Sequence, residues 1–138
     1  MALAGLMTLA SCTFEASDNG ALDGYWQLTQ TDTLSNGRSA DMRESGFFWA
    51  VQHRLLEVRN TRQGMLPVFF RFELRDGLLM LSHPVGDLRA IGDSTITDVA
   101  TLRPYGITRL SDTLRVLRLD SDHMTLQAQT VRMHFRKY

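Results

Sequence analysis

The sequence has almost no cysteine: Cys12 is the only one in 138 residues. No disulfide can form inside one chain, so an apolar core must hold the fold together. Hydrophobic residues make up 43% of the chain, which is ordinary for a globular protein. From residue 12 onward the chain is long enough for one domain with a substantial core.

The sequence also lacks an excess of positive charge, because fifteen acidic residues balance fifteen basic ones. Nucleic-acid binding needs a strong positive excess, so we expect no nucleic acid as partner. Residues 103–138 alone hold seven basic and three acidic residues. This segment is either a patch for an anion or a headgroup, or only the solvated face of strands.

Motifs of common enzymes and metal sites are missing as well. The sequence has no Gly-x-Ser-x-Gly motif and no glycine-rich loop that could hold a phosphate. Metal-ligand spacing is absent among the four histidines, which are His53, His83, His123 and His134. We therefore expect that the protein is not an enzyme and binds no cofactor or metal.

No apolar run is long enough to cross a bilayer, which takes about 20 residues. The apolar stretch from Met1 to Ala10 instead matches the central region of an export signal, about 7–15 residues long. It leads into Leu9-Ala10-Ser11-Cys12, which resembles the lipobox of bacterial lipoproteins. In such signals the thiol receives a diacylglycerol and the chain is cut just before it. The resemblance implies a signal peptide over residues 1–11 and a lipid on Cys12.

The positive start of a signal peptide is absent, because the first basic residue is Arg38. We expect the true start to lie upstream of Met1; a buried N-terminal helix is the alternative. Residues 12–21 then form the lipidated N-terminus and linker, and residues 22–138 the domain. The expected location is the bacterial cell envelope, where the lipid anchors the protein to a membrane. Among the membranes of the envelope, we expect the outer membrane first.

Alternation of apolar and polar residues predicts β-strands. Residues 68–75 alternate in this way, and Asp76-Gly77 follows them as a strong hairpin turn. This turn pairs Phe72 with Leu81. It also pairs Phe70 with His83, which is then either a rim residue pointing into a cavity or the place where the strand meets solvent.

The C-terminal region predicts a three-strand meander over residues 114–137. A turn at 121–122 pairs Leu119 with Met124 and Leu117 with Leu126, and a turn at 129–130 pairs Leu126 with Met133 and Met124 with Phe135. Upstream, a turn at 53–54 pairs Val51 with Leu56 and Trp49 with Val58, and residues 25–31 form a further strand.

Helix signals are few. Thr97 can cap a short helix over residues 98–103, which Pro104 would stop. Seven to nine antiparallel strands joined mainly by tight turns predict an all-β fold, a single small up-and-down β-barrel with at most one short helix. A sandwich is the alternative.

The strand that opens with Gly24-Tyr25-Trp26 resembles the Gly-x-Trp motif of lipocalins. The closing stretch, with Phe135-Arg136-Lys137, is similar to the end of lipocalin-like domains in small lipoproteins of Bacteroidetes, many without assigned function. The resemblance implies that Trp26 closes one end of the barrel and that Arg136 covers its ring, with Arg132 as the other candidate. Because the chain is shorter than a full lipocalin, a narrow or filled interior is an alternative to a ligand cavity.

Two functions remain open. In the first, the barrel binds a small apolar or amphipathic ligand, and the candidate lining is Trp49, Phe70, Phe72, Leu81, His83, Met124 and Met133; the alternative is that these residues form only the core. In the second, the domain is a non-catalytic envelope adaptor that binds a protein through its outer face, where Leu78 and Met80 share the outward side of their strand.

Overall fold

The computed structural model describes residues 19–87 and 94–138, so the predicted signal peptide and Cys12 lie outside the described residues. Short 3-10 helices are η1 (Gly20–Leu22), η2 (Val99–Thr101) and η3 (Arg103–Tyr105). The strands are β1 (Gly24–Thr33), β2 (Ser39–Asp41), β3 (Phe47–Gln52), β4 (Leu55–Asn60), β5 (Val68–Arg75), β6 (Leu78–Gly86), β7 (Ser94–Thr95), β8 (Asp112–Leu119), β9 (His123–Gln127) and β10 (Val131–Lys137).

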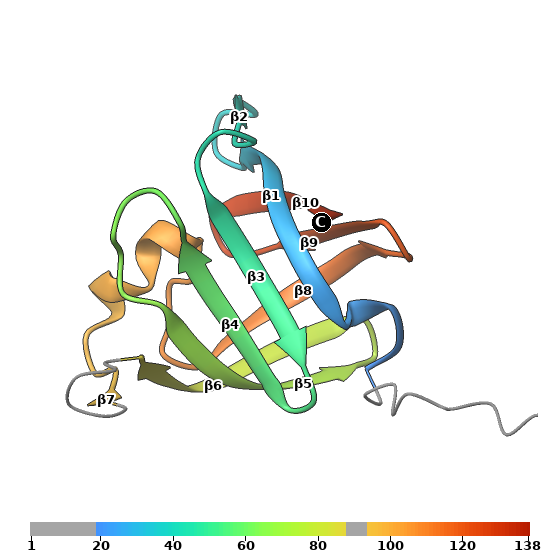
Figure 1. The fold of residues 1–138 in the computed structure, drawn as a ribbon. Coiled ribbons are helices and arrows are strands. Elements are labelled where there is room, and N and C mark those ends of the chain that lie inside the picture. Colours follow the sequence, from blue (N-terminus) through green and yellow to red (C-terminus); the bar gives the residue numbers. More distant parts are fainter. Residues whose placement is uncertain (1–18, 88–93) are drawn as a thin grey trace, which may run out of the picture.

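The predicted antiparallel β-barrel is confirmed (Figure 1). Its strand order runs β1-β3-β4-β5-β6-β8-β9-β10, and pairing of β10 with β1 closes the ring. The short strands β2 and β7 extend the sheet beside β1 and β6. Closure leaves the eight main strands without an open edge. Within the described part of the chain, no helix has the length and apolar composition that a membrane crossing requires.

Most of the predicted registers are correct. Phe72 pairs with Leu81 beside the Asp76-Gly77 turn, where both turn residues have the positive φ that this hairpin needs. The predicted pairs between β3 and β4, and between β9 and β10, are also present. Turn chemistry and alternation therefore fix the register wherever a strand runs without interruption.

Two predicted pairs are wrong because β-bulges shift the register. In β6, Arg71 of β5 pairs with Ser82 and Phe69 with Val85, so His83 and Pro84 together oppose the single residue Phe70. In β8, the neighbours of Leu117 pair with Leu126 and Thr125 of β9, and Leu117 itself is 45% exposed. An extra residue in one strand reverses which face its later side chains occupy.

The connection from β7 to β8 contains two 3-10 helices in place of the one predicted short helix. Asp98, and not Thr97, caps the first, because its carboxylate accepts a hydrogen bond from the Ala100 N–H. Pro104 lies inside η3, where its fixed φ suits the first turn of a helix.

Candidate functional site

The predicted ligand lining lies among side chains that fill the barrel. Trp49, Phe70, Leu81, Met124 and Met133 are each at most 1% exposed, and Phe72 is half-buried against them. Trp49 packs on Phe135, with ring centroids 5.1 Å apart. Exposure this low leaves no room for a water-sized sphere against these side chains, as expected for an eight-stranded barrel filled by its own residues. Their contact with a ligand stays a prediction.

One end of the barrel is covered by Trp26 and η1. Trp26 is fully buried, and its indole Nε1–H donates to the Leu22 carbonyl at 2.8 Å. The Lys137 ammonium lies 4.8 Å from the ring centroid and also donates to the Ala21 carbonyl. The prediction that Arg136 covers the ring is wrong, because Arg136 is exposed and occupies the outward side of β10.

Alternation along β10 explains this correction. Met133 and Phe135 point inward, so Lys137 is the next inward residue and Arg136 cannot be. Arg132, the other candidate, lies on the outside as well and donates to the Gln127 side chain at 2.9 and 3.2 Å. A lysine therefore supplies the cation–π contact for which an arginine was predicted.

The opposite end is covered by the segment that contains η3. Leu102, Tyr105 and Ile107 are at most 3% exposed. The Tyr105 ring meets the Phe47 ring edge-on, and its hydroxyl donates to the Leu66 carbonyl at 3.1 Å. Burial raises the pKa of the Tyr105 hydroxyl to about 12. Since both ends are covered, a molecule that enters the interior must displace packed side chains.

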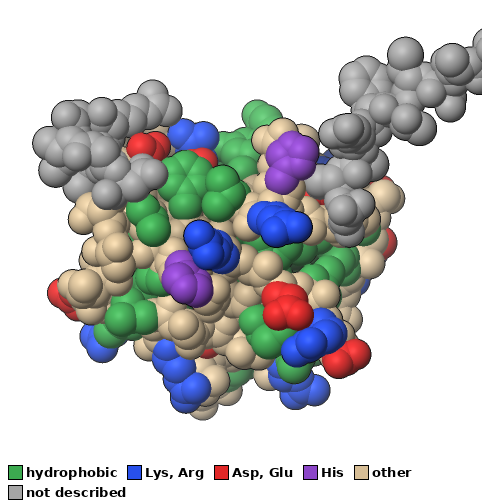
Figure 2. Space-filling model, turned by 90° about the horizontal axis from the view of Figure 1, so that it is seen from below, with side chains coloured by type: hydrophobic (Ala, Val, Ile, Leu, Met, Phe, Trp, Pro, Cys, Tyr) green, Lys and Arg blue, Asp and Glu red, His purple; other side chains and the backbone are tan. Residues whose placement is uncertain are grey.

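A groove lies on the outer face of β4, β5 and β6, next to β7. Its volume is about 590 Å³, and its lining is Leu55, Phe69, Phe70, Arg71, His83, Pro84, Val85, Asp87 and Thr95. Figure 2 views the side on which β5 and β6 lie in Figure 1 and shows hydrophobic side chains beside basic and histidine side chains. Two cross-strand rows build the site: Leu55 pairs with Arg71, and Phe69 pairs with Val85.

The bulge in β6 gives the groove its histidine. Strict alternation would turn His83 inward, like Leu79 and Leu81, but the bulge leaves it exposed on the outside. His83 has a φ of 53°, a left-handed conformation that costs a non-glycine residue about 1–3 kcal/mol. Its Nδ1 lies 3.0 Å from the Ser82 hydroxyl. The predicted pairing of His83 with Phe70 is thus wrong, and His83 lies where the strand meets solvent, the second of its two predicted positions.

The charged groups near the groove differ in how they are paired. Arg71 forms no ion pair with any residue that the structure describes, although it is exposed at the rim. The neighbouring acids are engaged elsewhere: Glu57 contacts Arg59 at 3.2 Å, and Glu73 contacts Arg75 at 3.5 Å. Asp87 lines the groove and has an interaction of its own. The groove therefore combines an apolar floor with a cation that has no ion pair among the described residues.

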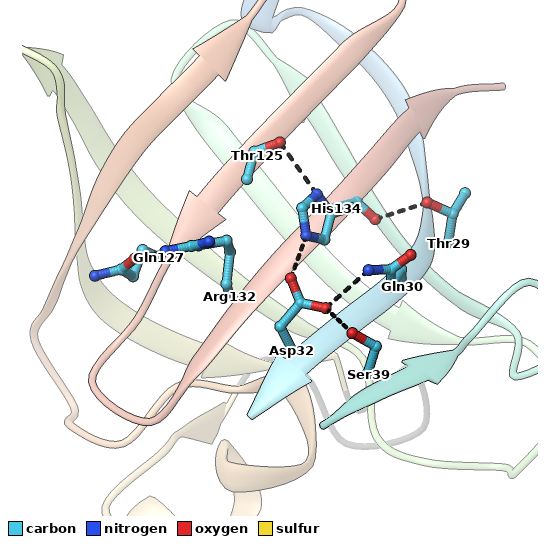
Figure 3. Close-up of polar contacts among 8 residues, drawn as sticks. All are labelled: Thr29, Gln30, Asp32, Ser39, Thr125, Gln127, Arg132 and His134. Carbon is cyan, nitrogen blue, oxygen red and sulfur yellow. Dashed lines mark hydrogen bonds and ion pairs between the residues drawn. The ribbon is translucent and has the colours of Figure 1, made fainter. Parts of the chain in front are cut away.

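A second polar cluster lies on the far side, where β1 meets β10 (Figure 3). His134 Nε2 lies 2.6 Å from the Asp32 carboxylate, which also accepts from Ser39 and Gln30 at 2.7 and 2.8 Å. These hydrogen bonds, that from Ser39 first and that from His134 next, hold the pKa of Asp32 well below its usual range. Ser39 donates to the carboxylate and not to the histidine, so the three do not form a nucleophile relay.

The described residues contain no group of three or more His, Cys, Asp or Glu side chains that could hold a metal ion. Sequence reasoning missed the groove because its histidine faces outward only through the bulge. The available signal was His83-Pro84, because proline lacks the N–H that a strand ladder uses, and bulges are among the few places where a sheet tolerates it.

Comparison with known proteins places these features in context. The model of a family described as lipocalin-like domain matches residues 7–138. The crystal structure of a lipocalin-like protein from Bacteroides uniformis is 19% identical with a TM-score of 0.66, and the match covers 86% of this chain and 100% of that chain. An uncharacterized protein from Bacteroides eggerthii is 18% identical with a TM-score of 0.58, covering 84% and 98%. No curated protein matches.

Proposed function

Because the chain belongs to the lipocalin-like domain family, we propose that it is a non-catalytic binding protein of the bacterial cell envelope. In this proposal a lipid on Cys12 anchors the protein to a membrane. Binding takes place on the outer face of the barrel, at the groove beside β6, and the interior is a packed scaffold. The partner can be a small molecule or another envelope protein.

The observation that carries this proposal is the contrast between the filled interior and the groove. The buried core side chains are at most 9% exposed and both ends are covered. The groove holds about 590 Å³, within the roughly 300–1,000 Å³ typical of small-molecule sites. A molecule can occupy the groove without displacing core residues. Binding in the interior, the other predicted mode, requires that the core or η3 give way.

The anchor and the groove lie close together in the proposed arrangement. The Asn19 side chain donates to the His53 carbonyl in the β3–β4 turn at 2.6 Å, two residues before Leu55. Asn19 lies seven positions after Cys12 in the sequence, and such a segment spans at most about 25 Å. A lipid on Cys12 would therefore keep the groove near the membrane surface.

Photo-crosslinking in the native host tests binding at the outer face. A benzophenone amino acid replaces Leu55 at the groove or, as a matched control, Leu117 on β8; these leucines are 52% and 45% exposed. We expect a defined adduct from position 55 and none from position 117. Equal adducts at both positions, or none at either, would contradict binding at the groove.

Membrane fractionation tests the anchor separately. Cys12→Ala removes the thiol that the lipid needs, so the protein should move from the membrane fraction to the soluble fraction. If both forms fractionate alike, the proposed lipid anchor on Cys12 is wrong. The crosslinking experiment still tests binding at the groove in that case.

A further inference from the structure

We infer that the groove binds a single-chain amphiphile with an anionic head group. The inference rests on the proposed outer-face function and names the class of its ligand. Two features of the groove support it: an apolar strip that would hold the alkyl chain, and a basic group at the rim that would bind the head group.

The apolar strip consists of Leu55, Phe69 and Val85, with the buried Pro84 beside them. Leu55 is 52% exposed, among the largest values for an apolar side chain in the described residues. Covering this surface with an alkyl chain removes apolar area from water on both partners, which is favourable. The strip is a surface feature, because the adjacent residue of β4, Leu56, is fully buried in the core.

The head-group contact is Arg71, with His83 beside it. Arg71 lies directly across from Leu55 and has no ion pair among the described residues, so its guanidinium is available. A guanidinium donates two parallel hydrogen bonds to a carboxylate or phosphate. The nearest acids on β4 and β5, Glu57 and Glu73, are each paired with their own arginine. Asp87, the acid in the groove lining, has an interaction of its own, so an anionic head at Arg71 is favoured over a cationic one.

The backbone at the groove argues against an extended peptide as the occupant. β5 pairs with β4 and β6, and β6 pairs with β5, β7 and β8. Peptides that bind by strand addition use free N–H and C=O groups at a sheet edge. Since both strands are paired on both sides, recognition here depends on side chains. An apolar strip with one cation at its rim suits an amphiphile.

Calorimetry with matched probes tests the inference. The full chain carrying Cys12→Ala is titrated with dodecanoate and with dodecyltrimethylammonium, both below their micelle concentrations. We expect one dodecanoate to bind per protein chain, at least about tenfold more tightly than dodecyltrimethylammonium. The free energy of one charge-assisted hydrogen bond corresponds to about that difference in affinity. Equal affinities would overturn the anionic head group, and binding of neither would overturn the amphiphile.

Variants locate the site. Arg71→Gln should weaken dodecanoate binding about tenfold and leave the weaker binding of the cation unchanged, while Arg115→Gln on β8 should change neither by more than about twofold. Leu55→Ser should weaken both probes, and Leu117→Ser neither. If the Arg115 and Arg71 variants behave alike, the site is not the groove. These side chains are exposed, and circular dichroism verifies that each variant folds.

Tryptophan emission separates the groove from the interior. Trp26 and Trp49 are the only tryptophans and both are at most 1% exposed inside the barrel. A terminally brominated dodecanoate should bind without strong quenching; strong quenching would place the chain inside and overturn both proposals. If crosslinking from position 55 gives a protein adduct and dodecanoate does not bind, the outer-face function stands and the amphiphile is wrong.

Discussion

The two sides of the barrel wall handle their polar groups differently. At the seam between β1 and β10, Ser39 and His134 both hydrogen-bond to the Asp32 carboxylate, and Thr29 donates to the His134 carbonyl. At the groove side, Arg71 stands beside exposed Leu55 without an ion pair among the described residues. The seam joins residues 102 positions apart in the chain. Polar groups that satisfy each other there hold the barrel closed, whereas Arg71, which has no ion pair among the described residues, is available for a ligand.

The largest effect on stability should be the difference between substitutions on the inner face and on the outer face of β5, the strand beside the groove. Phe70 is 1% exposed inside the barrel, and its neighbour Phe69 lines the groove. Phe70→Ala should lower the free energy of unfolding by about 3–5 kcal/mol, because it leaves a cavity in the core. Phe69→Ala should cost about 1 kcal/mol, since only part of its ring is buried. Urea denaturation measures both. Equal losses would mean that the two rings are not on opposite faces.

The hydrogen bonds of Asp32 at the seam should make the stability of the protein depend on pH. Hydrogen bonds from Ser39, His134 and Gln30 lower the pKa of Asp32 below the value of about 3.9 that it has in an unfolded chain. The stabilisation that this carboxylate provides is therefore present above about pH 4 and is lost as the pH falls further. Asp32→Asn should lower the free energy of unfolding at pH 7 by about 1–2 kcal/mol, and the difference between variant and wild type should shrink between pH 4 and pH 2.

Two other carboxylates serve as internal controls. A hydrogen bond from the Arg43 side chain lowers the pKa of Asp41 to about 2, and backbone hydrogen bonds at residues 122 and 123 do the same for Asp120. Both titrate in the wild type and in Asp32→Asn, so their contributions cancel in the comparison. A difference that stays constant down to pH 2 would show that Asp32 is not held ionised by the seam.

Sequence reasoning predicted the parts of this fold in which local rules act alone. The Asp76-Gly77 turn and the alternation around it give the pairing of Phe72 with Leu81, and the same logic gives the pairing of Met124 with Phe135. The position of Trp26 at a barrel end follows instead from the resemblance to the Gly-x-Trp motif, and Trp26 is fully buried beside η1. Turn residues and a two-residue period carry this information within about ten residues of chain.

The groove was not predictable in the same way. It depends on a one-residue insertion in β6 that moves His83 outward, and on pairing with β4 that places Leu55 beside Arg71. A bulge leaves the composition of a strand nearly unchanged, so alternation alone cannot locate it. The Lys137 contact, by contrast, was predictable, because the inward side of β10 follows from Met133 and Phe135.

A smaller effect should appear where the seam strand β10 ends. Lys137→Met removes the cation over Trp26 and the hydrogen bond to Ala21, and should cost about 0.5–2 kcal/mol. Arg136→Met is the matched control, since Arg136 is exposed on the other face of the strand, and should change stability by less than about 0.5 kcal/mol. Thermal denaturation ranks the two. A larger loss of stability in Arg136→Met than in Lys137→Met would show that Arg136, and not Lys137, makes the cation–π contact.

The smallest effect on stability should come from the groove itself. Leu55 is 52% exposed and Leu56 beside it is fully buried, so one strand offers a surface leucine and a core leucine in sequence. Leu55→Ser should change the free energy of unfolding by no more than about 0.5 kcal/mol, whereas Leu56→Ala should cost about 2–5 kcal/mol. In ligand binding the ranking should reverse: Leu55→Ser weakens dodecanoate, and Leu56→Ala, measured where it is still folded, leaves its affinity nearly unchanged. A Leu55 variant that loses stability as the Leu56 variant does would make Leu55 part of the core, and the groove would then be a feature of packing and not a site.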